Sequence, residues 1–409
     1  MRQQIDVHKV RDRYERAIKL LRSDTRISTE NKRTIISFLN DIQAEGVRLA
    51  RVVKYLYLLP ELARRLKKDF VAADIEDLKK LVASINGSTY SDSTKSDFRV
   101  ALKRFYRWIR KCPPGQSPPE IAWIKCGDHS RRVLPEELLT DEEVLRMAEV
   151  CENSRDRAFL LCTSETGGRI GELLNLRRKH VEFDQYGVIL RFSGKTGDRP
   201  VRAVASSAAL AQWMSDHPSK EPDAPFWVVI GDKSHGHPLL YHSSRALLRR
   251  LAKRAGVKKR VNPQSFRHAR ASLLANALTE RQMEQYLGWT PGSKMPKVYV
   301  HLSGRDIDSA LLRMHGIATQ EHQNNLAKLT RTMCPRCKLS NGPTDKFCGK
   351  CGLPLSVEAA MEYEKERRNA DDLMSRLLED PAVRELLLTK LRSLTKRGEA
   401  SPQETFFEV

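Results

Sequence analysis

The stretch TGGRIGELLNLR occupies residues 166–177, and GVILRFSGKTGDRPVRAVA follows it at residues 187–205. In the first stretch two glycines precede Arg169 at a predicted helix start, and Glu172 lies one helical turn further on, where it can orient the arginine. The second stretch alternates apolar and polar residues around SGKTGD, which predicts a β-hairpin with Lys195 at its tip. A helix start followed by a hairpin indicates a mixed α+β domain in this part of the chain.

Two later stretches carry further candidate site residues, NPQSFRHARASLLANAL at 262–278 and YLGWTPGSKMPKVYVH at 286–301. The first places Arg267 and His268 near a predicted helix start. The second contributes Trp289, Tyr299 and His301. The order of these residue types along the chain is therefore Arg-x-x-Glu, a hairpin lysine, Arg-His, Gly-Trp and Tyr-x-His.

Structural roles compete with functional ones at several of these positions. Lys195 also fits a solvated turn, Trp289 fits the packed floor of a site, and His301 fits a structural role. Tyr241 and Tyr286 are further tyrosines in this part of the chain, but the helical apolar spacing around Tyr286 favours a place in the core.

Taken together and in this order, the stretches resemble the tyrosine recombinase family, which includes the phage integrases and the Xer-type enzymes. TGGRIGELLNLR resembles the family's first arginine box, GKTGDRPVRAV its lysine hairpin, QSFRHARAS its H-x-x-R-H box, and LGW with VYVH its tyrosine box. The resemblance covers roughly residues 20–317, and YVHLSGRDIDSALLRMHGI is most similar to integrases of archaeal type. It implies a multidomain, mainly α protein with a helical SAM-like core-binding domain and a mixed α+β catalytic domain.

The resemblance also implies a role for each residue that matches a family motif. Tyr299 matches the nucleophile, Arg169 and Arg267 the arginine pair, Lys195 the hairpin lysine, Glu172 the acid beside the first arginine, Trp289 the His/Trp position, and His268 the histidine after the second arginine. Gln264 departs from the family, which usually has a histidine there. Glutamine can donate a hydrogen bond to a phosphate oxygen, but it does not titrate near neutral pH as histidine does. A phosphate-binding role is retained at this position, and a proton-transfer role is put in doubt.

These residue types suit the cleavage of a phosphodiester. Two guanidinium groups offer forked donors to the non-bridging oxygens, where negative charge grows in the transition state. A tyrosine of pKa about 10 loses its proton as it attacks, and a lysine can protonate the departing 5′-hydroxyl. The phosphotyrosyl bond conserves the energy of the broken bond. The sequence therefore predicts a site-specific DNA recombinase or integrase that works through a 3′-phosphotyrosyl intermediate and a Holliday junction, without ATP, a catalytic metal or another cofactor for catalysis.

Other functions remain open at this point. A chromosome-dimer resolvase or an invertase would use the same chemistry, and a non-catalytic DNA-binding protein would only clamp DNA. A type IB topoisomerase shares the chemistry but fits the N-terminal helices and the C-terminal cysteines less well. A covalent adduct with DNA would separate the catalytic from the non-catalytic alternatives.

The charge of the chain points to the same partner. The 409 residues include 72 Lys and Arg against 51 Asp and Glu, a formal net charge of +21. Such a balance fits double-stranded DNA, and the basic segment at 245–260, RALLRRLAKRAGVKKR, is expected to provide part of the grip. The polar start MRQQIDVHKVRDRYER and the lack of a long apolar run predict a cytoplasmic protein without a membrane partner.

The domain organisation follows from helix signals and breaks in composition. We expect a helical core-binding domain at 1–111, a proline-rich linker at 112–130, the catalytic domain at 131–317, a connector at 318–333, a zinc ribbon at 334–354 and a helical tail at 355–409. Expected helix starts and ends include Ser28, Gly46, Gly87, the capping box of Thr140 with Glu143, and Asp380 before Pro381. Pro60 is expected to break or bend its helix.

Four of the eight cysteines predict a metal site. Cys334 and Cys337 form CPRC, and Cys348 and Cys351 form CGKC after ten residues. Two CxxC pairs can provide four thiolates to one structural Zn²⁺. Two disulfides are the alternative, which a reducing cytoplasm disfavours.

Assembly is expected from the family resemblance, because strand exchange between two duplexes needs four active sites. The predicted assembly is a homotetramer on DNA. Two apolar helical stripes beyond the tyrosine offer contacts between protomers, one through Ile307, Leu311, Leu312 and Met314, and one from Val383 to Leu394.

Overall fold

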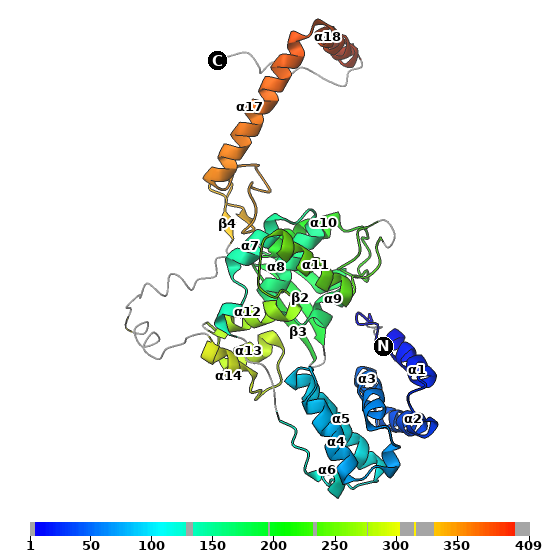
Figure 1. The fold of residues 1–409 in the computed structure, drawn as a ribbon. Coiled ribbons are helices and arrows are strands. Elements are labelled where there is room, and N and C mark those ends of the chain that lie inside the picture. The colour runs from blue at the N-terminus through cyan, green and yellow to red at the C-terminus, as the bar shows by residue number, and fades with distance from the viewer. Residues whose placement is uncertain are drawn as a thin grey trace.

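The computed structural model describes residues 5–127, 134–194, 197–231, 235–275, 277–302, 315 and 331–396. These residues are mainly helical, with a small sheet in the middle of the chain. Figure 1 shows an N-terminal helical unit, a central mixed unit, and a C-terminal arm that extends away from both. The fold class expected from the sequence is confirmed. None of the helices in these described ranges combines the length and the hydropathy that a membrane span requires.

The N-terminal unit contains a bundle of helices around an aromatic core. Its helices are α1 (Val10–Ser23), α2 (Thr29–Ala44), α3 (Leu49–Leu66), α4 (Ile75–Asn86), α5 (Asp92–Ile109) and α6 (Pro119–Ala122). Phe38 and Phe105 lie edge to face with ring centroids 5.1 Å apart, and Phe70 packs against Phe105 in the same way at 4.9 Å. Ser28 caps α2 by accepting a hydrogen bond from the Asn31 N–H. The aromatic rings of Phe98, Phe105 and Tyr106 on α5 are therefore buried in the core of this unit.

Of the two expectations at Pro60, a break or a bend, the break is not observed. Helix α3 runs without a break from Leu49 to Leu66 and contains Pro60, because burial of the surrounding apolar side chains stabilises the helix despite the missing N–H. Ile121 and Ile124, which lie within the expected linker at 112–130, are buried in the core of the helical unit.

The central unit surrounds a three-stranded antiparallel sheet with helices. The sheet has the order β1 (Val181–Asp184), β2 (Gly187–Gly194) and β3 (Gly197–Ala203). The helices are α7 (Asp141–Glu149), α8 (Ser154–Thr166), α9 (Ile170–Leu174), α10 (Ser207–Asp216), α11 (Tyr241–Arg254), α12 (Pro263–Ala275), α13 (Glu280–Leu287) and α14 (Met295–Leu302). The expected hairpin is β2–β3, which pairs as far as Gly194 with Gly197. The expected capping box of Thr140 and Glu143 begins α7.

A short N-terminal segment joins the two units on the side away from the linker. Val7 is 4% exposed and belongs to the core of the central unit rather than to the helical bundle. The Ile5 N–H donates to Asn175 Oδ1 over 2.8 Å, and the Tyr241 N–H donates to the Val7 carbonyl over 3.0 Å. The helical unit is therefore tied to the central unit by residues before α1 as well as by the chain after α6.

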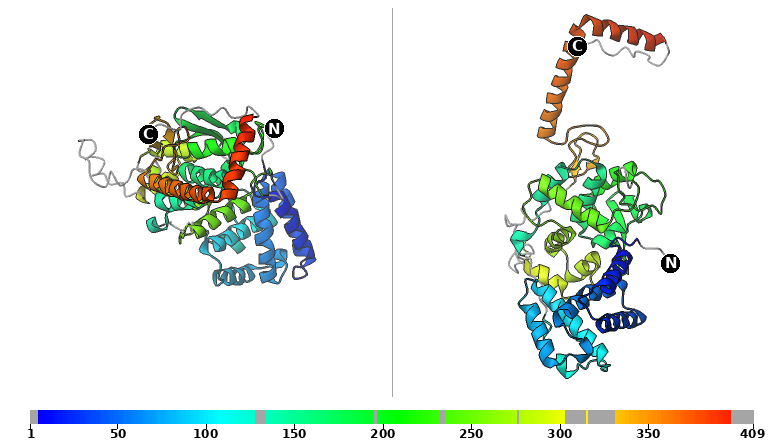
Figure 2. Two further views of the ribbon diagram at one scale, coloured as in Figure 1. Left: turned by 90° about the horizontal axis from the view of Figure 1, so that it is seen from above. Right: turned by 45° about the vertical axis from the view of Figure 1, so that its right-hand side comes forward.

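The C-terminal arm consists of a two-stranded ribbon and two helices. Strands β4 (Thr332–Met333) and β5 (Ser340–Asn341) pair antiparallel, and α17 (Val357–Glu379) and α18 (Pro381–Lys396) follow. Asp380 caps α18 as expected, accepting from the Ala382 N–H over 2.8 Å. The right-hand view in Figure 2 shows α17 and α18 outside the two packed units. The expected apolar stripe at 307–314 lies outside the described residues.

Candidate active site

The first arginine is positioned by the turn between α8 and α9. Gly167 ends α8 with φ +56°, a left-handed conformation that glycine adopts without strain. A Cβ on Gly168 would lie 2.7 Å from the ring of Phe192, so only glycine fits between α9 and the sheet. Arg169 then caps α9, and its backbone N–H and Nη1 each donate to the Glu172 carboxylate over 3.0 Å. Glu172 orients Arg169 as the sequence predicted, and the Arg169 side chain remains 36% exposed.

Arg199 is a site residue that the sequence motifs did not reveal. It lies on β3, and its Nη1 and Nη2 donate to the two oxygens of Glu172 over 2.9 and 2.8 Å. Both side chains are nearly buried, with 9% of Arg199 and 3% of Glu172 exposed. Burial acts to raise the pKa of Glu172, but the hydrogen bonds and charges of Arg199 and Arg169 outweigh it and lower the pKa. One carboxylate therefore holds a helix start and the hairpin together.

The turn end of the hairpin lies directly against this carboxylate. A Cβ on Gly194, the last residue of β2, would be 2.6 Å from Glu172 Oε1. Lys195 follows Gly194 and lies outside the described residues, so its role stays a prediction. The signal that could have found Arg199 is its place in the hairpin, two residues after Gly197 at the start of β3.

The second arginine is held in the interior of the site. Arg267 of α12 is 4% exposed, and it donates to the carbonyls of Gly167 and Leu287 over 2.9 and 2.8 Å. Its guanidinium carbon lies 5.6 Å from the centre of the Trp289 ring. Burial, followed by the neighbouring charge of Arg169, lowers the pKa of Arg267 to about 10, so the side chain is a cation at neutral pH.

Tyr299 lies beside this arginine and is covered by other side chains. It is 1% exposed, and its ring stacks on Trp289 with centroids 5.5 Å apart and planes inclined by 11°. Its hydroxyl lies 2.7 Å from His268 Nδ1. Burial raises the pKa of Tyr299, although the positive charge of Arg267 acts in the opposite direction. The phenol is therefore neutral at physiological pH until a base or a cation assists its ionisation.

Gln264 completes this row of side chains. Its amide nitrogen lies 3.3 Å from His268 Nε2, one helical turn away on α12. Gln264 also lines a hollow of about 940 Å³ together with Arg169 and Glu172, and with His8 and Arg11 from the N-terminal unit. The hollow is lined by residues of both units, and Arg169 is the member of the arginine pair that faces it.

The other tyrosines occupy structural positions. Tyr286 contacts the core, and its hydroxyl donates to the Arg202 carbonyl over 3.2 Å, as the sequence spacing predicted. Tyr241 packs against His8, with ring centroids 4.7 Å apart. The side chain of His301 lies outside the described residues.

The basic segment at 245–260 is only partly available to a ligand. Arg254 pairs with Glu152 over 2.8 Å. Lys259 Nζ donates to the Leu138 carbonyl over 2.7 Å and to the Glu143 carboxylate over 3.0 Å. The expectation that this segment provides part of the grip on DNA stays a prediction, and these contacts show that some of its cations pair with α7 and with the loop before α8 instead. Lys258 and Arg260 remain exposed.

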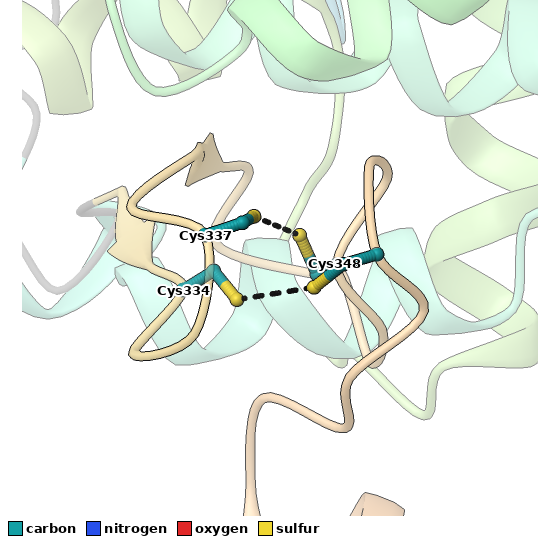
Figure 3. Close-up of side chains that lie close together, drawn as sticks. Cys334, Cys337 and Cys348 are labelled. Atoms are coloured by element: carbon teal, nitrogen blue, oxygen red, sulfur yellow. Dashed lines mark hydrogen bonds between the residues drawn. The ribbon is translucent and has the colours of Figure 1, made fainter.

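The four C-terminal cysteines gather as the sequence predicted. Figure 3 shows Cys334 and Cys337 on one side of the ribbon, facing Cys348 on the other. The sulfurs of Cys334 and Cys351 are 3.6 Å apart, and those of Cys337 and Cys348 are 3.4 Å apart. A disulfide requires about 2.05 Å, whereas sulfurs about 2.3 Å from a tetrahedral Zn²⁺ are about 3.8 Å apart. All four ligand atoms lie within 4.8 Å of one another, so the cluster fits a metal better than it fits disulfides.

Comparisons with known proteins agree with this geometry. Residues 137–305 match the model of the phage integrase family. The tyrosine recombinase XerC of Xanthomonas campestris pv. campestris (strain B100) is 27% identical over 242 residues, covering 58% of this chain and 72% of its own. The tyrosine recombinase XerA of Pyrococcus furiosus is 23% identical over 292 residues, covering 70% of this chain and 96% of its own. Residues 137–305 are therefore similar to the phage integrase family, and the relatives named here are tyrosine recombinases.

Solved structures share the fold. The XerH site-specific recombinase, in a post-cleavage complex with palindromic difH substrate, is 18% identical and aligns with a TM-score of 0.53 over 77% of this chain and 98% of its own. The Tn1549 transposon integrase in complex with transposon right-end DNA is 17% identical and aligns with a TM-score of 0.53 over 70% of this chain and 99% of its own. Both alignments exceed the length of the family match and so extend beyond residues 137–305.

Proposed function

We propose that the chain is a site-specific DNA recombinase that cleaves and rejoins DNA strands through a 3′-phosphotyrosyl intermediate and a Holliday junction. One cluster of contacts carries this proposal. Arg267 lies against the buried Trp289 ring, and Tyr299 stacks on the same ring. Glu172 orients Arg169 beside them. A tyrosine hydroxyl beside two fixed cations is suited to attack on a phosphodiester. The similarity of residues 137–305 to the phage integrase family supports the same assignment.

The proposed roles follow from charge and position. Arg169 and Arg267 bind the non-bridging oxygens of the scissile phosphate and stabilise the charge that develops there. Tyr299 attacks the phosphorus, and Lys195 at the hairpin tip protonates the 5′-oxygen as it leaves. Trp289 holds the tyrosine ring, and Glu172 holds Arg169. Arg267 now donates to two backbone carbonyls, so DNA has to compete with them for its guanidinium.

The proposed cofactor is a structural zinc ion bound by the four clustered cysteines, Cys334, Cys337, Cys348 and Cys351. Zinc would bring four thiolates to one point and so fix a ribbon whose two strands have only two residues each. The proposed reaction assigns no step to a metal or to ATP, because the arginines supply the positive charge and the phosphotyrosyl bond conserves the energy.

The proposed partner is double-stranded DNA, on which the chain acts as a homotetramer. Support comes from a lambda integrase tetramer bound to a Holliday junction, which is 14% identical and aligns with a TM-score of 0.51 over 66% of this chain. The formal net charge of +21 favours binding to DNA.

Capture of covalent adducts tests the proposal. The full-length chain is incubated with duplexes from the DNA that flanks its gene, each carrying a nick that lets the released strand diffuse away. Denatured protein is then recovered and its DNA sequenced. We expect adducts at a defined sequence with the wild type, and with Tyr299→Phe normal binding but no adducts. Adducts that persist in Tyr299→Phe would remove this residue from the role, and their absence from the wild type would contradict the proposed function.

A further inference from the structure

Two features of α12 bear on how the tyrosine loses its proton. The family usually has a histidine where this chain has Gln264, and glutamine does not accept a proton near neutral pH. One turn further along the same helix, His268 places Nδ1 2.7 Å from the Tyr299 hydroxyl. A base that acts on the tyrosine must lie within such a hydrogen-bond distance.

Both nitrogens of the His268 ring are engaged. Nδ1 contacts the tyrosine hydroxyl, and Nε2 lies 3.3 Å from the side-chain amide of Gln264. An amide has an acceptor at one end and donors at the other, so rotation by a half turn lets Gln264 accept a hydrogen bond from Nε2–H. In that arrangement Nδ1 carries a lone pair directed at the tyrosine proton.

We propose that His268 accepts the proton of Tyr299 when the tyrosine attacks the scissile phosphate, and that Gln264 positions the His268 ring for this transfer. This inference rests on the proposed function. In the forward step the Tyr299 O–H bond breaks and the Nδ1–H bond forms, while the tyrosine oxygen bonds to phosphorus and the bond from phosphorus to the 5′-oxygen breaks. The 5′-oxygen takes its proton from a separate acid. In rejoining, His268 returns its proton to the departing tyrosine oxygen.

The surroundings keep His268 in the form that such a base needs. Burial, and then the adjacent charge of Arg267, lower the pKa of His268 below its ordinary value, so the ring is neutral at physiological pH. Tyr299 from α14 and Arg267 from its own helix are the charged or titratable groups that act on it within the described ranges. The acids of the neighbouring helices are engaged elsewhere. Glu165 of α8 accepts from the backbone after β3, and Glu284 of α13 accepts from the Ser293 N–H.

The stacking of Tyr299 on Trp289 adds to the geometric argument. Two flat rings 5.5 Å apart limit the rotation of the phenol, so its hydroxyl stays close to Nδ1. Tyr299 is 1% exposed, which means that water cannot readily take the proton in place of His268. A neighbouring side chain is then the available acceptor.

The test measures single-turnover cleavage by the full-length chain on a duplex recovered in the adduct experiment. We expect His268→Gln, which keeps a hydrogen bond but cannot take up a proton, to slow cleavage by about a hundredfold or more. The control is His237→Gln, which changes an exposed histidine and is expected to cleave at the wild-type rate. Equal rates in His268→Gln and the wild type would overturn the inference while leaving the proposed function intact, because the wild type still forms adducts. Faster cleavage in His268→Gln would also overturn it, since the contact would then restrain the nucleophile.

Two further measurements separate a proton acceptor from a packing residue. Wild-type cleavage should rise with pH through the lowered pKa of His268, on the acid side of about 6.5, and His268→Gln should lose this rise. A substrate with sulfur in place of the bridging 5′-oxygen needs no proton on its leaving group, so it should restore cleavage to Lys195→Ala but not to His268→Gln. Restoration in both variants, or a pH profile that His268→Gln does not change, would contradict the assignment. Added imidazole should partly restore His268→Ala, and melting curves establish that each variant is folded.

Discussion

Arg199 joins two parts of the site through one side chain. Its guanidinium binds both oxygens of Glu172, a carboxylate that is 3% exposed and also holds Arg169. A Cβ on Gly288 would lie 2.4 Å from Arg199 Nη1, so the turn after α13 is closed around the arginine as well. Arg199 therefore helps to position Arg169, a proposed reacting group, although Arg199 has no assigned part in the proposed reaction.

Removal of Arg199 should destabilise the protein strongly. Arg199→Ala leaves the Glu172 carboxylate buried and short of one partner, which typically costs about 3–5 kcal/mol. The matched control is Arg202→Ala on the same strand, where the ion pair with Asp184 is more exposed, at 39% and 35%, and is worth less than about 1 kcal/mol. Chemical unfolding at pH 7 measures both free energies. Equal losses in the two variants would show that burial of Glu172 does not matter.

The pH dependence of that loss has a defined sign. The folded-state pKa of Glu172 is lowered in the wild type. The stabilisation is therefore complete above the unfolded-state pKa of about 4.3 and disappears as the pH falls through the lower folded-state value. The difference in melting temperature between the wild type and Arg199→Ala should thus shrink as the pH falls from about 4.3 towards the lower folded-state pKa. A difference that grows on acidification would contradict the sign.

At the scale of the elements, the turn between α8 and α9 requires small residues. A Cβ on Gly168 would come within 2.7 Å of the Phe192 ring, which is 1% exposed, whereas one on Gly171 would meet only His8 Nε2 at 4.0 Å. Gly168→Ala should therefore force the sheet and α9 apart and cost about 1–3 kcal/mol. Gly171→Ala should leave the melting temperature unchanged or slightly raised. Melting curves of the two variants measure the contrast, and similar values would contradict the packing argument.

The ribbon should depend on metal while the cleavage chemistry does not. Removal of zinc by a chelator leaves four thiols with no ion between them, so the ribbon should lose its structure. Metal analysis should find a single zinc ion per chain, and Cys348→Ser should lose it, whereas Cys126→Ser, at an exposed cysteine, should keep it. Adduct formation by a chain truncated after Gly316 should continue in excess chelator. A requirement for Mg²⁺ in that form would contradict the proposed mechanism.

Local signals in the sequence predicted the helix ends, but they did not predict the contacts between residues that are far apart in the sequence. The caps at Ser28 and the Thr140–Glu143 box depend on residues within one turn, so their spacing alone reveals them. The pair of Glu172 and Arg199 joins positions 27 residues apart, and no periodicity reports such a contact. Strand β1 was missed because only Val181 of its four residues is buried, which leaves no alternation to detect.

At the scale of the whole molecule, the basic residues fall into two groups: some hold helices in place, and others are exposed to solvent. Lys259 is held by Glu143 and the Leu138 carbonyl, while its neighbours Lys258 and Arg260 are exposed. Charge alone therefore does not identify the surface that meets DNA. A test of the basic segment has to leave Lys259 in place, because its reversal would disturb α7 instead of DNA binding.

Charge reversal at the two exposed positions should reduce the salt dependence of DNA binding. The slope of log K against log salt becomes shallower by about 0.9 for each phosphate that the protein no longer neutralises. Lys258→Glu with Arg260→Glu should therefore flatten the slope measurably. The control, Lys365→Glu with Arg376→Glu on exposed positions of α17, changes the net charge equally. Fluorescence anisotropy over a range of salt concentrations gives both slopes. An unchanged slope in the first double variant would mean that these residues face solvent only.

Assembly should depend on DNA because of the same excess of charge. A formal net charge of +21 per chain opposes close approach of protomers, and repulsion between exposed charges is screened only beyond about 8 Å at physiological salt. Helix α17 acts in the opposite direction, since Met361 and Leu373 are 70% and 60% exposed and gain from burial in a contact between chains.

We expect repulsion between the chains to prevail, so the free chain should be a monomer or a weak dimer. The dimer should weaken further in Met361→Glu with Leu373→Glu. A duplex with two binding arms neutralises the charge and should yield the tetramer in both forms. Light scattering with and without this duplex measures the masses, and a stable tetramer of the free chain would contradict the charge argument.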